Sequence, residues 1–152
     1  MGLLSALRNL LDPSSNPGEL PGDVDPVQLA TAALFVEVMR SDFDEAPAER
    51  QVVESALARL LALDAAGVSE LLAVAEDAAR ESVSLFEFTH PIHQNLSPEQ
   101  KVEIIEGLWR VVFADGRMDA HEDHMMSKIR GLLHIPQEDY VAAKQRARDG
   151  ST

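Results

Sequence analysis

The feature that most constrains the fold of this chain is an internal repeat. Each copy consists of an apolar helical stretch, an acidic turn and a second apolar stretch that closes on two leucines. The copies span residues 34–63 and 107–135, and the distance from the turn aspartate (Asp42 or Asp115) to the double leucine differs by one residue. A solenoid needs three or more stacked repeats. We therefore expect two helical hairpins packed as halves of one globule.

Apolar residues recur at helical spacing along most of the chain, and no segment alternates as a strand would. Alanine, leucine, glutamate and arginine dominate, and only 5% of residues are aromatic, which favours helices over sheets. We predict an all-α, single-domain bundle of about seven helices. The predicted helices cover residues 2–11, 25–42, 48–63, 65–88, 97–114 and 120–133, with a last one after Pro136. We expect Pro91 to interrupt the helical structure near His90. We expect Phe86 and Phe88 to pack at the edge of the core and close it.

Residues 1–24 and 25–149 are expected to form separate parts. The first part holds a short amphipathic helix, Gly2–Leu11, and a linker rich in proline, glycine and serine. The second part is the helical domain, and it opens with Asp25, Pro26 and Gln28. These residues are typical of a capped helix start. We expect the first helix to dock on the domain, and the alternatives are that it binds a partner helix or contacts a membrane surface.

Charge narrows the range of partners. The chain has 26 acidic and 13 basic residues and a formal net charge of −13. This excludes nucleic acid, which requires a basic face, and limits any membrane contact to a peripheral one. Cations and a protein with a basic surface remain as partners. The alternative is that the acidity serves solubility alone.

The sequence contains no cysteine, no long apolar stretch and no signal-peptide pattern. Without cysteine, disulfides and thiolate metal sites are excluded. A membrane span requires about 20 apolar residues, and the start of the chain lacks the pattern of a signal peptide. We therefore expect a cytoplasmic protein.

The second acidic turn is the best candidate for a functional site. Gly116 permits a tight turn, and Asp115, Asp119 and Glu122 are placed to converge across it. Converging carboxylates repel one another unless a cation lies among them, and hard divalent cations prefer oxygen ligands. The alternative is a capping box, with Asp119 as N-cap and Glu122 reaching back from the third position. The spacing leaves both interpretations open, and they are compatible.

Other chemistry is less well supported. The first turn offers Asp42, Asp44 and Glu49 but lacks the glycine, so its geometry must differ. His121 and His124 lie three residues apart, and together with the neighbouring acids they could bind zinc. The zinc-protease motif does not match, because its two histidines are four residues apart. No nucleophile elbow or phosphate-binding glycine loop is present, and we predict that the protein is not an enzyme.

Residues 108–122 resemble the Ala-Asp-Gly-x-x-Asp-x-x-Glu signature of the tellurite-resistance protein B (TerB) family. The runs Leu85–Thr89 and Lys128–Leu133 resemble a TerB-like bacterial subgroup of unassigned function. The resemblance covers about Val27 to Ala147. The first half departs from the signature, because Asp42 has no alanine before it and no glycine after it.

The resemblance implies a cytoplasmic bundle in which two acidic hairpins are brought together by pseudo-symmetry. It also implies chelation of a divalent metal ion, such as calcium, magnesium or zinc, and a role in stress-response complexes. The implied ligands are Asp115, Asp119 and Glu122, with a weaker set of Asp42, Asp44 and Glu49. The function predicted is a stress-associated module that binds metal and a protein partner. The alternative is a metal-free acidic scaffold for protein interaction.

Overall fold

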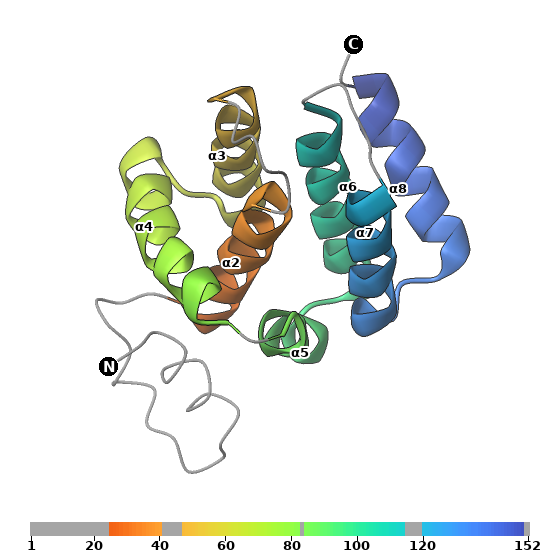
Figure 1. Cartoon of the computed structure of the whole chain (residues 1–152), viewed down its shortest axis with the longest axis horizontal. Helices are drawn as coiled ribbons and strands as arrows, with labels where there is room; N and C mark the ends of the chain where they lie inside the picture. The colour runs from red at the N-terminus through yellow and green to blue at the C-terminus, as the bar shows by residue number, and fades with distance from the viewer. Residues whose placement is uncertain (1–24, 41–46, 83, 115–119, 151–152) are drawn as a thin grey trace.

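The computed structural model describes residues 25–40, 47–82, 84–114 and 120–150. For residues 40, 47–49, 120 and 121 it describes the backbone but not the side chain. These residues form helices joined by short connections (Figure 1). The helices are α2 (Pro26–Arg40), α3 (Pro47–Leu61), α4 (Ala65–Glu81), α5 (Phe86–Asn95), α6 (Pro98–Ala114), α7 (Ala120–Leu133) and α8 (Gln137–Gly150). The predicted all-α fold is confirmed. The predicted helix Gly2–Leu11 lies outside the described residues.

Side-chain caps explain where several helices begin. Asp25 Oδ1 accepts a hydrogen bond from the Val27 backbone N–H at 2.8 Å, which caps α2 as predicted. Ser97 and Gln100 form the complete capping box predicted for α6. The Gln100 N–H donates to Ser97 Oγ at 3.2 Å, and the Ser97 N–H donates to Gln100 Oε1 at 2.9 Å. Each cap satisfies helix N–H groups that would otherwise lack a partner.

The prediction of one helix over residues 65–88 was wrong. Helix α4 ends at Glu81, because Ser82 adopts an extended conformation with ψ of 140°, and α5 begins afresh at Phe86. Pro91 does not interrupt the chain but lies buried inside α5. A proline there removes one backbone hydrogen bond. Phe88 is fully buried as expected, whereas Phe86 is 51% exposed.

Helix α2 forms the centre of the bundle. Every side chain from Leu29 to Met39 is buried except that of Glu37, which is partly exposed. Helices α3, α4, α5 and α6 all pack against it. Helix α6 is the matching centre of the second half, where α7 and α8 pack on it and Trp109 is fully buried. Burial of these apolar faces stabilises the fold.

The two hairpins of the predicted repeat are α2–α3 and α6–α7. In both hairpins the second helix ends in the same way. The next residue, Ala62 after α3 and His134 after α7, adopts the left-handed conformation, with φ of 54° and 57°. After each, a backbone N–H reaches back five residues: Leu63 to Ala58 O and Ile135 to Arg130 O, both at 3.1 Å. This is the Schellman arrangement, and its recurrence after each double leucine confirms the repeat.

The halves differ in what surrounds them. Helix α3 packs on α6 of the other half, whereas α5 packs between α2 and α7 (Figure 1). Gly107 permits the close crossing of α2 and α6, because a Cβ there would lie 2.9 Å from Phe35 Cζ. The repeat therefore determines the structure of each hairpin but not how the two hairpins pack on one another.

Candidate functional site

The predicted metal ligands fall mostly outside the description. Asp42, Asp44, Asp115 and Asp119 lie outside the described residues, and Glu49 lies in α3 but its side chain is not described. Whether the two acidic turns converge therefore stays a prediction. In the described part of the chain, no three histidine, aspartate or glutamate residues are grouped so as to hold a metal ion. That finding covers only one of the six candidate side chains.

Glu122 is the candidate whose side chain the structure describes. It lies in the first turn of α7 and is only 4% exposed, whereas Asp123 and His124 beside it are exposed. A buried carboxylate needs a donor or a positive charge nearby, and the positive end of a helix favours it. The burial of Glu122 is compatible with both the capping and the metal-ligand interpretations.

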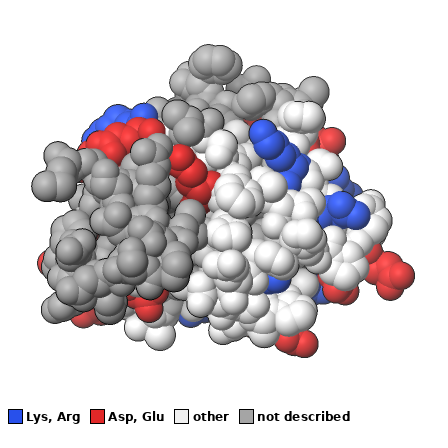
Figure 2. Space-filling model, turned by 90° about the horizontal axis from the view of Figure 1, so that it is seen from below, with Lys and Arg blue, Asp and Glu red and all other residues white. Residues whose placement is uncertain are grey.

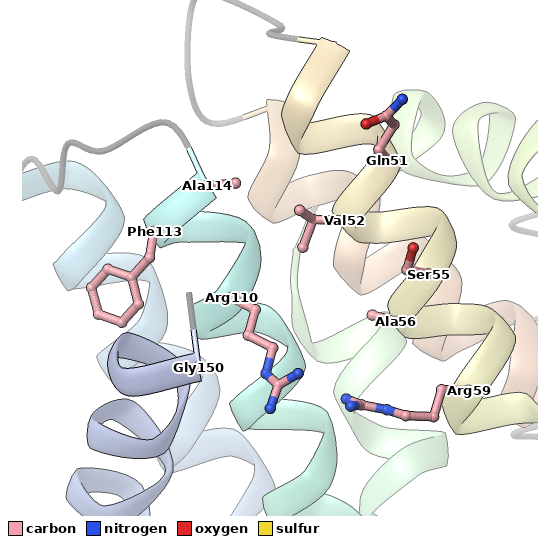
Figure 3. Close-up of a pocket in the computed structure, with 9 residues that line it drawn as sticks. All are labelled: Gln51, Val52, Ser55, Ala56, Arg59, Arg110, Phe113, Ala114 and Gly150. Atoms are coloured by element: carbon pink, nitrogen blue, oxygen red, sulfur yellow. The ribbon is translucent and has the colours of Figure 1, made fainter. Parts of the chain in front are cut away.

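A cavity of about 620 Å³ lies between α3 and α6 (Figure 3). It extends along α3 from Gln51 to Arg59 and reaches Ala114 at the end of α6. Gln51 and Val52 come from the first turns of α3, shortly after the first acidic turn in sequence. Ala114 ends α6, directly before Asp115. Described residues next to both turns therefore border one space.

Sequence reasoning missed the two arginines of this cavity, Arg59 and Arg110. They are 51 residues apart in sequence, and no motif joins them. Arg110 Nη2 donates to Glu106 Oε2 at 3.2 Å, and Arg146 of α8 also donates to Glu106. Only the packing of α3 on α6 brings them to one cavity, so nothing in the sequence pattern marks them.

A second polar cluster lies where α5, α6 and the end of α7 meet. The His93 and His134 rings stack with centroids 4.3 Å apart, and Lys101 Nζ lies 2.6 Å from His93 Nδ1. Lys101 is only 8% exposed. Desolvation lowers the pKa of His93 below 6.5, and the charge of Lys101 lowers it further. Both effects favour the neutral ring, whose Nδ1 can accept a hydrogen bond from the Lys101 ammonium group.

The fold and the acidic turns define a class of protein: an acidic, all-α domain built from two helical hairpins. The chain belongs to the tellurite resistance protein TerB family, whose model matches residues 28–145. No curated protein and no solved structure matches the chain significantly. Across the described residues, no helix has the length and apolar character that a membrane span requires.

Proposed function

We propose that this protein is a non-enzymatic, stress-associated module that binds a divalent metal ion through its acidic turns and engages a protein partner. The observation that best supports the proposal is the burial of Glu122, which is only 4% exposed in the first turn of α7, beside the second acidic turn. The packing of α3 on α6 is the second support, because α3 follows the first acidic turn in sequence and α6 precedes the second.

The ligand chemistry suits a hard cation. Asp115, Asp119 and Glu122 supply carboxylate oxygens from the second turn, and Asp42, Asp44 and Glu49 supply a further set from the first. Calcium and magnesium prefer such oxygen ligands, and zinc accepts them. A metal ion bound by the folded chain alone would stabilise it by mass action, by about 2.7 kcal/mol at about 100 times Kd.

Thermal unfolding with added calcium, magnesium or zinc tests the proposal. We expect at least one ion to raise the melting temperature, and Asp115→Ala with Asp119→Ala to abolish the rise. Asp42→Ala with Asp44→Ala should reduce it less, because the first turn departs from the family signature. As a control, Asp77→Ala with Glu81→Ala removes two acids from α4 and should leave the rise intact. No shift with any ion up to millimolar concentrations would refute the metal role.

A variant of Glu122 separates the two interpretations of that residue. Glutamine also serves at the third position of a capping box but lacks the charge that a cation requires. We expect Glu122→Gln to keep most of the stability of the metal-free protein and to weaken metal binding. A loss of stability with unchanged metal affinity would assign Glu122 to capping alone.

The net charge of −13 favours a second candidate, a metal-free acidic scaffold for a basic protein. On the face shown in Figure 2, the described residues form a broad uncharged area with acidic and basic residues around it. Across the described part of this face, negative charge is therefore not spread evenly. Capture of a basic partner that weakens with salt but is insensitive to chelator would support the scaffold.

The proposal places the protein in the cytoplasm and gives it no catalytic residue. An enzyme of this kind would use Glu122 or a histidine as a base, with a metal ion beside it. Hydrolase activity that disappears in Glu122→Gln would therefore overturn the non-enzymatic assignment.

A further inference from the structure

Two arginines converge on the cavity between α3 and α6. Figure 3 shows Arg59 extending from α3 and Arg110 from α6, with their guanidinium groups directed toward one another. A guanidinium group is charged at every physiological pH and offers only hydrogen-bond donors. Two of them facing one another repel, and an anion between them would remove that repulsion.

Among the described residues, the carboxylates near the cavity do not neutralise this charge. Glu106 is shared between Arg110 and Arg146, so one carboxylate serves two guanidinium groups. Arg110 Nε is buried and has no acceptor within the described chain. Arg59 is exposed and forms no ion pair with a described residue. The described residues that line the cavity therefore carry surplus positive charge, although the chain as a whole carries −13.

The other walls combine polar and apolar groups. Gln51 and Ser55 add an amide and a hydroxyl from α3, and Val52 and Ala56 form an apolar wall beside them. The end of α8 also reaches Arg110, since a Cβ built on Gly150 would lie 3.6 Å from Arg110 Nη2. The negative end of this helix offsets part of one charge. Arg59, in the last turn of α3, lies across the cavity from Arg110 and the end of α8.

We propose that this cavity is a binding site for a small organic anion. A carboxylate or phosphate group would lie between Arg59 and Arg110, because the guanidinium fork matches the oxygen pairs of both groups. The apolar part of the ligand would lie against Val52 and Ala56. A volume of about 620 Å³ falls within the range of small-molecule sites.

This site is separate from the proposed metal site, because it uses cations from α3 and α6 rather than carboxylates from the turns. Binding should therefore be measured in the presence of chelator. Calorimetric titration with phenyl phosphate and with benzoate tests the two anionic groups on one apolar body. We expect at least one to bind, inorganic phosphate to bind more weakly, and neutral benzyl alcohol to give no heat. The stronger of the two anions identifies the preferred group.

Matched arginine variants provide the decisive comparison. Arg59→Gln should weaken binding about tenfold or more, as expected when a charge-assisted hydrogen bond is lost. Arg80→Gln removes an exposed arginine from the last turn of α4, outside the cavity, and should change nothing. Because Arg59 is exposed, its replacement leaves the core intact.

Two results would overturn the proposal. One is the absence of heat from both anions at about 10 mM, a concentration that reveals even millimolar affinity. The other is an equal loss of affinity in Arg59→Gln and Arg80→Gln, which would indicate general attraction by surface charge. Amide NMR shifts that map to Ser55, Ala56 and Ala114 would instead support the site.

Discussion

The two halves of this domain share a plan but not an environment. In the first half α2 packs with α3 and α4, and in the second α6 packs with α7 and α8. Each hairpin closes on a left-handed residue after its double leucine. Yet α3 lies against α6, while α7 lies against α5. The comparison shows that a repeated sequence can specify a hairpin while the neighbouring helices decide which of its faces are covered.

The short helix α5 is the main source of the difference. It follows α4 and joins the first half to α6 of the second half. By packing between α2 and α7, it occupies the position that α7 would need in order to mirror the contact of α3 with α6. The arginine cavity thus forms on the α3 side of the domain.

The largest expected effect concerns the helix crossing that joins the halves. Gly107→Ala should lower the free energy of unfolding by about 1–3 kcal/mol, because the new Cβ would press on the fully buried ring of Phe35. Gly131→Ala, in a helix of the same half, meets no atom within 4 Å. It should stabilise by about 0.5–1 kcal/mol through helix propensity. Urea denaturation of both variants checks the pair, and equal changes would contradict the close crossing.

The left-handed caps should give a smaller, unequal pair of effects. Ala62→Gly should stabilise the first hairpin by about 0.5–1 kcal/mol, because glycine adopts positive φ without steric cost. His134→Gly should gain less, since it also removes the ring stacked on His93. Thermal unfolding of the two variants measures the difference. Equal gains would show that the histidine stack contributes nothing to the second hairpin.

The smallest expected effect is a pH dependence of stability that arises from His93, the ring stacked on the cap residue His134. The pKa of His93 is below 6.5 in the folded chain, and unfolding restores the ordinary value of 6.5. As pH falls through 6.5 the unfolded chain takes up this proton first, so stability declines until the folded pKa is reached and is constant below it. The groups around His93 that carry or acquire charge are Lys101, His134 and His90.

Paired measurements isolate that contribution. Unfolding free energies at about pH 7.5 and about pH 5.5 should fall further in the wild type than in His93→Gln, since carboxylates contribute equally to both proteins. The difference should be small, because His93 is only partly buried. Parallel pH profiles would indicate that the ring titrates alike in the folded and unfolded chain.

Much of the fold follows from local sequence, and the exceptions have physical causes. The caps at Asp25 and Ser97 were predictable, because side-chain acceptors at those spacings satisfy helix N–H groups. The break after Glu81 was not, because residues 65–88 keep an apolar pattern and no glycine or proline marks Ser82. Pro91 was misleading, since burial in α5 outweighs one missing hydrogen bond.

The candidate sites divide in the same way. The second acidic turn is a candidate that the sequence alone indicates, because a glycine and three spaced acids lie within eight residues, and it stays a prediction. The cavity was not, because Arg59 and Arg110 acquire their relation only when α3 packs on α6. Local spacing identifies what one turn can do, whereas a site shared by distant helices depends on tertiary contacts.

The burial of α2 has a consequence for biosynthesis. This helix is among the first described parts of the chain to leave the ribosome, yet α6, which covers one of its sides, is made about 60 residues later. At typical synthesis rates the delay lasts several seconds, during which an apolar segment is uncovered. Chaperones that hold nascent apolar segments should therefore engage this chain early, and premature termination before α6 should yield an aggregating fragment.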